Sequence, residues 1–150
     1  MKEMRRVRIE SLGHVVIKVR DLKAAEQFYN QVLGISIQSR SEAEQMIFFT
    51  LGQHHDFAVI AIGAEAAPPN PDAVGTHHIA FKVGGIDDLR EAKARLEAVG
   101  VTVAPVDHHV TKSLYFSDPD GNALEIYAEG SDDWKSDPDL LFAPVRKLSL

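Results

Sequence analysis

An internal repeat restricts the fold of this chain more than any other feature of its sequence. Residues 14–19 match residues 78–83 at an offset of 64, and both segments place apolar side chains at every second position. Alternation with a period of two is typical of β-strands that pack one face against a core. His14 and His78 open the two segments, so we expect them at equivalent places on equivalent strand faces, on the side away from the core.

The same succession of elements follows each of these strands. Apolar residues at helical spacing run through 22–33 and 89–99, and each run ends at a glycine, Gly34 or Gly100, suited to a left-handed C-terminal cap. Three further strands are predicted in each half, at 35–39, 46–51 and 57–62 and at 101–106, 113–117 and 123–128. Each half is therefore β-α-β-β-β, which predicts an α+β fold.

Neither half is long enough to bury a hydrophobic core large enough for a stable domain alone. We therefore predict one two-module domain over residues 1–150. The two βαβββ modules would form a curved, mostly antiparallel, eight-stranded cup with the helices outside. Its parts are module 1 at about 10–65, a proline-rich connector at 66–72, module 2 at about 73–129 and a C-terminal tail at 130–150.

The composition excludes several classes of function. The 16 Lys and Arg are outnumbered by 22 Asp and Glu, giving a formal charge of −6, and the sequence has no basic stripe for nucleic acid. The absence of cysteine removes thiolate nucleophiles and zinc–thiolate sites. No apolar run approaches the ~18–20 residues of a membrane helix, and the start of the chain lacks the apolar core of a signal peptide. We therefore expect a cytoplasmic protein that binds neither nucleic acid nor membrane.

Strand parity selects the side chains that face away from the helices. In the last predicted strand Leu124 and Ile126 share the core face, which leaves Glu125 on the inner face among apolar neighbours. A glutamate there is costly unless it is exposed, paired or bound to a metal. Tyr115 lies on the inner face by the same rule, although taken alone it fits core packing as well as catalysis.

Two histidines and this glutamate converge if the inner faces of the two modules meet. His14, His78 and Glu125 form the two-histidine, one-carboxylate set that leaves open positions on a non-haem Fe(II). A single histidine at the start of a strand is usually a half-buried polar residue. Here the repeat places two histidines at equivalent positions on one face, which chance alone explains poorly. Val59, at offset 66, is the repeat equivalent of Glu125, so we expect one metal site per chain. His55 joins the inner face through its parity with Val59.

Three segments resemble the paired modules of the vicinal oxygen chelate superfamily: LGHVVIKVRDLKAAEQFYNQVLGI, HHIAFKVGGIDDLREAKARLEAVGV and SLYFSDPDGNALEIYAE. The resemblance covers roughly residues 10–129 and leaves the tail outside it. This superfamily includes glyoxalase I, methylmalonyl-CoA epimerase, fosfomycin and bleomycin resistance proteins and type I extradiol dioxygenases, so the fold does not decide the chemistry. By position, the resemblance makes His14, His78 and Glu125 the metal ligands.

The closest resemblance is to extradiol ring-cleavage enzymes of the catechol 2,3-dioxygenase type. The segment QHHDFAV, residues 53–59, resembles the part of those enzymes that carries their acid–base histidine, and His55 is the matching residue. Tyr115 matches their active-site tyrosine, and His108 resembles a further active-site histidine. The stretch after His108 is about two residues shorter than in those enzymes, so His109 is kept as an alternative. Many of those enzymes also carry a second, metal-free module pair, which this sequence does not show.

The resemblance implies an oxidoreductase that opens the ring of an aromatic diol and inserts both atoms of O₂. The expected cofactor is Fe(II), with Mn(II) as the alternative, and the expected assembly is a homodimer. His55 would remove and return a proton, Tyr115 would donate a hydrogen bond to the substrate, and His108 would steady the bound oxygen. A glyoxalase-type lyase, an epimerase, a resistance transferase and a metal-free small-molecule binding protein are the alternatives. The modules could pair within one chain or exchange between two.

Overall fold

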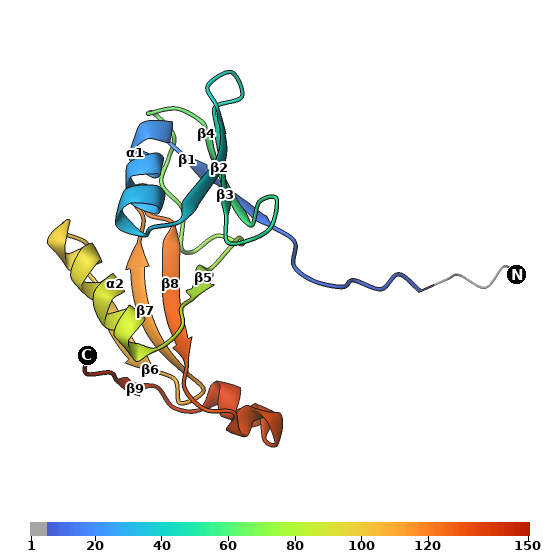
Figure 1. Ribbon diagram of the computed structural model, residues 1–150, viewed down its shortest axis with the longest axis vertical. Coiled ribbons are helices and arrows are strands. Elements are labelled where there is room, and N and C mark those ends of the chain that lie inside the picture. Colours follow the sequence, from blue (N-terminus) through green and yellow to red (C-terminus); the bar gives the residue numbers. More distant parts are fainter. Residues whose placement is uncertain (1–5) are drawn as a thin grey trace, which may run out of the picture.

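The computed structural model of the chain describes residues 6–150 and contains two β-sheets flanked by helices (Figure 1). The first module comprises β1 (Val15–Val19), α1 (Leu22–Glu26), the π-helix η1 (Gln27–Val32), β2 (Ser36–Ser41), β3 (Met46–Thr50) and β4 (Phe57–Ala61). The second comprises β5 (Ile79–Lys82), α2 (Ile86–Ala98), β6 (Ala104–Asp107), β7 (Thr111–Ser117) and β8 (Ala123–Glu129). The tail adds two 3-10 helices, η2 (Asp133–Lys135) and η3 (Pro138–Phe142), and the short strand β9 (Arg146–Lys147).

The strands form two separate sheets, ordered β1-β4-β3-β2 and β5-β8-β7-β6-β9. In each module the first strand runs parallel to the last, and the remaining pairs are antiparallel. The prediction of an α+β fold with two βαβββ modules and outer helices is confirmed. The expected run of eight strands is divided between the two sheets, because β1 and β5 are both edge strands and do not pair with each other. The tail supplies an additional strand, β9, which pairs with β6.

The helical segment of module 1 differs from the single helix that its apolar spacing predicts. After one α-helical turn and a half, the chain widens into η1, where the N–H of Leu33 donates to the carbonyl of Phe28, five residues back, at 3.0 Å. Gly34 and Gly100 follow the two helices with φ of +76° and +80°, as expected for left-handed C-terminal caps.

One apolar core joins the two modules. The ring of Tyr29 in η1 packs against Phe49 and Phe57, and Phe57 makes an edge-to-face contact with Phe81 of β5, with ring centroids 5.5 Å apart. Aromatic pairs in this geometry add to the free energy gained by burying their surface. The sheets are thus joined through the packing of their core-facing sides and not through strand pairing.

The strand register corrects one sequence-based assignment. Glu125 of β8 is paired with Ala80 of β5, and the repeat equivalent of Ala80, Val16, is paired with Ala58 of β4. Ala58 is therefore the structural counterpart of Glu125, and the assignment of Val59 to that role is wrong. Val59 is fully buried in the core. The repeat offset increases to 67 (125 − 58) by the last strand, a change that strand pairing reveals and residue spacing does not.

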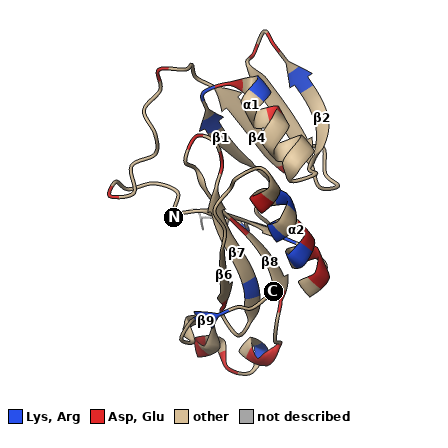
Figure 2. Ribbon diagram, turned by 90° about the vertical axis from the view of Figure 1, so that its left-hand side faces the viewer, with Lys and Arg blue, Asp and Glu red and all other residues tan. Residues whose placement is uncertain are grey.

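The outer surface of the second module is charged. Along α2, Arg90, Lys93 and Arg95 each form an ion pair with an acidic residue one turn away, and Figure 2 shows basic and acidic positions interspersed on this helix. Within residues 6–150 no helix has the length and apolarity needed to cross a bilayer. The first five residues, on which the expectation about a signal peptide partly rests, lie outside the described part of the chain.

The junction of the two modules should be sensitive to the loss of Phe57. Replacing Phe57, which is 1% exposed, with Ala removes contacts to both modules and leaves a cavity. We expect the free energy of unfolding to fall by about 3–5 kcal/mol in urea titrations followed by circular dichroism. Val74→Ala, at a fully exposed position, should change it by less than about 0.5 kcal/mol. A change below about 1 kcal/mol for Phe57→Ala would contradict a core shared between the modules.

Candidate functional site

His78 and Glu125 face each other on the inner face of the second sheet. His78 immediately precedes β5 and Glu125 lies within β8, and the parallel register of these strands brings the two side chains together. The Nε2 atom of His78 is 3.0 Å from Oε2 of Glu125. The other carboxylate oxygen, Oε1, accepts a hydrogen bond of 2.5 Å from the hydroxyl of Ser113 on β7. An imidazole and a carboxylate, both nitrogen or oxygen donors, are thus held side by side.

Ser113 is a candidate site residue to which the sequence analysis assigned no role. It is fully buried, and Glu125 is 7% exposed. A buried carboxylate is tolerated when its oxygens are hydrogen-bonded, and the Ser113 hydroxyl supplies one such bond. The signal that could have identified Ser113 is its parity: it is two residues from Tyr115 in a strand antiparallel to that of Glu125.

Tyr115 and His108 form a second pair beside the first. Tyr115 is directly opposite Glu125 in the β7–β8 register, and its ring lies edge-on to the ring of His78, with centroids 5.7 Å apart. The Tyr115 hydroxyl is 2.8 Å from Nε2 of His108, which lies in the turn between β6 and β7. Burial raises the pKa of the Tyr115 phenol, and the Glu125 carboxylate raises it further, so the phenol stays protonated and can donate a hydrogen bond.

The structure separates the two histidines that sequence analysis left as alternatives. His108 points to Tyr115, whereas Nε2 of His109 is 3.2 Å from the Asp133 carboxylate at the start of the tail. His109 also has a φ of +67°, an uncommon value for a residue other than glycine. The geometry therefore favours His108 as the member of the candidate site, and it gives His109 a contact that anchors the tail.

His14 and His55 lie together on the first module. Their ring centroids are 4.2 Å apart, and the His55 ring is 4.9 Å from that of Phe48 on β3. His55 belongs to the bend before β4, so the strand parity invoked for it does not extend to its position. Its partial burial lowers the pKa of the imidazole, and the neighbouring His14 and His54 lower it further. His55 is thus biased toward the neutral form, which can accept a proton.

Two further histidines contact site residues. Nδ1 of His77 is 2.7 Å from Nδ1 of His78, and Nδ1 of His54 is 2.7 Å from Nδ1 of His55. Sequence analysis assigned no chemistry to His54 and His77. Each of these hydrogen bonds engages Nδ1 of the neighbouring ring, which for His78 leaves Nε2 directed at Glu125. Contacts of this kind fix the orientation of an imidazole.

The six predicted site residues fall into two groups. One group contains His78, Glu125, Tyr115 and His108 and lies on the second module. The other contains His14 and His55 and lies on the first. In the part of the chain from residue 6 onward, no group of three or more His, Asp or Glu side chains is close enough to hold a metal ion.

The separation has a structural cause. The side-chain amide of Asn122, immediately before β8, donates to the carbonyl of Lys18 at 3.2 Å, so it is the end of β1 that meets the second sheet. His14 is four residues further back, which corresponds to about 13 Å along an extended strand. A cleft of about 730 Å³ lies at this junction, lined by β1, the proline-rich connector and the residues that lead into β5, including His77.

The tail lies at the end of the second sheet that is remote from the first (Figure 1). The N–H of Gly130 donates to the carbonyl of Val110 at 2.8 Å, and an added Cβ at Gly130 would lie 2.5 Å from the backbone oxygen of His109, so glycine is required there. The tail keeps Leu141 and Phe142 exposed. It is therefore anchored beside the turn that carries His108.

Comparison with known proteins identifies the family. A profile of the Glyoxalase/Bleomycin resistance protein/Dioxygenase superfamily matches residues 11–126, which includes both modules. The chain belongs to this superfamily, as the resemblance of its repeated segments predicts.

Individual relatives within the superfamily differ in activity. Biphenyl-2,3-diol 1,2-dioxygenases 2 and 3 of Rhodococcus globerulus are 33% and 36% identical over 76% and 77% of this chain. The matched regions make up only 60% and 61% of those two enzymes. Glutathione transferase FosA of Serratia marcescens is 31% identical, over 79% of this chain and 81% of its own length. A glyoxalase/bleomycin resistance protein/dioxygenase domain from Frankia sp. EAN1pec has the same fold, with a TM-score of 0.69 at 21% identity over 81% of this chain and 99% of that one.

The hydroxyl of Ser113 should stabilise the buried Glu125 carboxylate. Ser113→Ala leaves Oε1 of Glu125 without this donor, and we expect the free energy of unfolding to fall by about 1–3 kcal/mol at neutral pH. Ser117→Ala, at an exposed position of the same strand, should change it by less than about 0.5 kcal/mol. Equal effects of the two substitutions in urea titrations would show that the short hydrogen bond contributes nothing to the folded state.

Proposed function

We propose that this chain is a metal-dependent extradiol dioxygenase that opens the ring of a catechol-like aromatic diol and inserts both atoms of O₂. The observation that carries the proposal is the group formed by His78, Glu125, Tyr115 and His108. It combines two potential metal ligands with a hydrogen-bonded phenol and imidazole on one face of the sheet. The identity to two biphenyl-diol dioxygenases supports the same reaction class.

The donor set suits a divalent transition metal. Imidazole nitrogen and carboxylate oxygen are the ligands of the two-histidine, one-carboxylate iron sites. Ser113 hydrogen-bonds to Oε1 of Glu125, and His77 hydrogen-bonds to Nδ1 of His78. Bonds of this kind to the atoms that do not bind the metal orient metal ligands. We propose Fe(II), with Mn(II) as the alternative, held by His78, Glu125 and His14. A metal held by these residues would supply Lewis-acid activation of the diol and a route for electron transfer from the diol to O₂.

The remaining residues have roles set by their contacts. Tyr115 keeps its proton and donates a hydrogen bond toward the bound diol, with His108 positioned to accept from the same hydroxyl when no substrate is present. His55, biased toward the neutral imidazole, removes a proton from the diol and returns it later in the reaction. His108, hydrogen-bonded to Tyr115, would steady the dioxygen in the site.

We propose further that the protein acts as a homodimer in which His14 comes from the second copy. Within the described residues His78 and Glu125 lie together and His14 lies apart, so a single chain supplies two of the three ligands. β1 and β5 are edge strands, and Val16, two residues after His14, is 44% exposed on the inner face. Edge strands with exposed apolar side chains favour association with another strand. A symmetric dimer would bring β1 of each copy to β5 of the other and form two equivalent sites.

Ring cleavage is tested directly with the Fe(II)-loaded protein. Anaerobic loading, followed by air and a series of catechols including 2,3-dihydroxybiphenyl, should give O₂ uptake equal to substrate consumed and a yellow ring-opened product. Glu125→Gln should lose tight Fe(II) binding, and His55→Ala should bind iron but turn over at least about 10²-fold more slowly. Metal binding without O₂ uptake for any catechol would favour a lyase or transferase of the superfamily. Absence of metal binding would favour a small-molecule binding protein.

Subunit complementation tests the origin of His14. His14→Ala and Glu125→Gln each remove one ligand, and each homodimer should bind little Mn(II). When the two variants are coexpressed in equal amounts, about half of the dimers are mixed, and a site shared between chains is intact once in each mixed dimer. Bound Mn(II) should then recover to about one quarter of the parent's level. No recovery, in a preparation shown by mass spectrometry to contain mixed dimers, would place all three ligands in one chain.

A further inference from the structure

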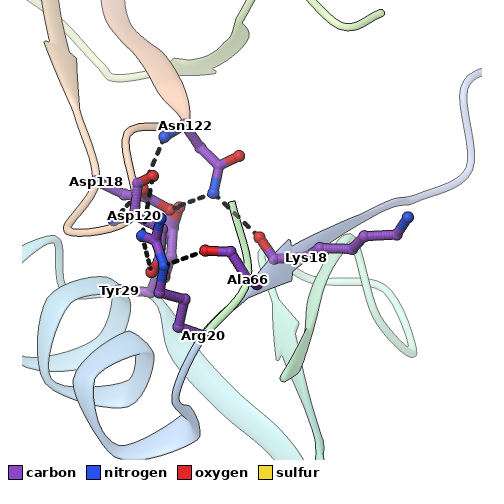
Figure 3. Close-up of polar contacts among 7 residues, drawn as sticks. All are labelled: Lys18, Arg20, Tyr29, Ala66, Asp118, Asp120 and Asn122. Carbon is purple, nitrogen blue, oxygen red and sulfur yellow. Dashed lines mark hydrogen bonds and ion pairs between the residues drawn. The ribbon is translucent and has the colours of Figure 1, made fainter. Parts of the chain in front are cut away.

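A buried carboxylate outside the candidate site connects the two modules. Asp118, in the turn between β7 and β8, is 5% exposed. Its Oδ2 atom accepts hydrogen bonds from the Tyr29 hydroxyl at 2.6 Å and from the Asn122 side-chain amide at 2.8 Å. Its Oδ1 atom accepts from the backbone N–H groups of Asp120 and Asn122, both at 2.9 Å. Figure 3 shows these side chains converging between the turn and the helical segment of module 1.

Asn122 extends the connection to β1. Its side-chain amide also donates to the carbonyl of Lys18 at 3.2 Å. Arg20, just after β1, forms an ion pair with Asp120 of the turn at 3.0 Å. It also donates to the carbonyl of Ala66 in the connector at 2.7 Å (Figure 3). One five-residue turn of module 2 is therefore bonded directly to β1 and η1 of module 1, and through Arg20 to the connector.

The corresponding turn of module 1 shows that these contacts are not a requirement of the turn itself. The turn between β3 and β4 ends at Asp56, whose Oδ2 accepts only from the N–H groups of Leu51 and Gln53 within the same turn. Its carboxylate makes no hydrogen bond to the other module among the described residues. The β7–β8 turn thus has an additional role beyond closing a hairpin.

Tyr29 reaches Asp118 from the π-helical segment η1. Inserted π-helical turns shift the direction of side chains and are frequent at functional positions. Burial and the Asp118 carboxylate both raise the pKa of the Tyr29 phenol, so the phenol stays protonated and donates. Among residues 6–150, Tyr29 is the module 1 residue whose side chain donates a hydrogen bond to Asp118, so this bond connects the two modules directly.

We propose that Tyr29, Asp118 and Asn122, the turn clamp, are positioning residues for the candidate metal site. Tyr115 is three residues before Asp118 on β7, and Glu125 is three residues after Asn122 on β8. The clamp therefore fixes the end of the hairpin that carries both side chains. Through Lys18 it also fixes β1, the strand that His14 immediately precedes. This inference rests on the proposed metal site, whichever chain supplies His14.

The test compares Mn(II) binding by the clamp variants with binding by a control variant that also weakens the fold. Tyr29→Phe keeps the buried ring and removes the hydroxyl, and Asn122→Ala removes the bridge from Asp118 to Lys18 while leaving the backbone bonds of the turn. The matched control is Ala92→Gly in α2, which weakens the helix at a position outside the turn. Affinity is measured by titration calorimetry and site geometry by the electron paramagnetic resonance spectrum of bound Mn(II), at a temperature where circular dichroism shows each variant to be folded.

We expect Tyr29→Phe and Asn122→Ala to weaken Mn(II) binding about 10-fold or more and to alter the spectrum, as loss of outer supporting contacts does at metal sites. Ala92→Gly should bind Mn(II) like the parent. Parent-like affinity and spectrum in both clamp variants would overturn the inference and leave the proposed function standing. Weakening in Ala92→Gly equal to that in the clamp variants would also overturn it, because general destabilisation would then explain the effect. A parent protein that binds no Mn(II) would overturn the proposed metal site and the inference together.

Discussion

The two β-sheets are joined by a shared apolar core and not by strand pairing, and the rest of the structure depends on this. Phe57 packs against Tyr29 within its own module and against Phe81 of the other, so the core-facing sides of both sheets are buried together. Because the contact is made by these sides, β1 and β5 keep free edges. The end of β1 lies against the residue that leads into β8, and among the described residues His14 does not join His78 and Glu125 in one metal-binding group.

The buried polar groups are confined to one hairpin. Among the described residues, the buried polar or charged side chains are those of Ser113, Asp118 and Glu125, all on β7, β8 or the turn between them. Burying a carboxylate is costly, and each of the two carboxylates is hydrogen-bonded on both oxygens or faces an imidazole. One carboxylate supplies the candidate ligand and the other connects the modules. Module 1 has Ala58 at the position that corresponds to Glu125, so the two halves of the repeat differ in chemistry while keeping one fold.

Much of this architecture could be predicted from the sequence because its signals are local. Alternation with a period of two identified β1 and β5 and placed Val15, Ile17 and Val19 toward the core, and the glycines at 34 and 100 marked the helix ends. Parity also placed Glu125 and Tyr115 on one face, where the register makes them direct neighbours. The reasoning about His55 was less sound, because Phe57 and Val59 face the core and His55 precedes the strand. The role of Tyr29 was hidden, since an apolar helical spacing does not reveal a π-helical turn.

The sequence by itself determined the repeated β-α-β-β-β order, the fold class, the family and the residue types available for a site. Each of these depends on side-chain periodicity or on short segments that the chain carries wherever it folds. The tertiary structure alone decided which candidates meet: His78 with Glu125, His108 with Tyr115, and His14 with His55. It also selected Asp118 as the partner of Tyr29 across 89 residues of chain. Such pairings follow from how two sheets pack, and packing is a property of whole surfaces that no local spacing encodes.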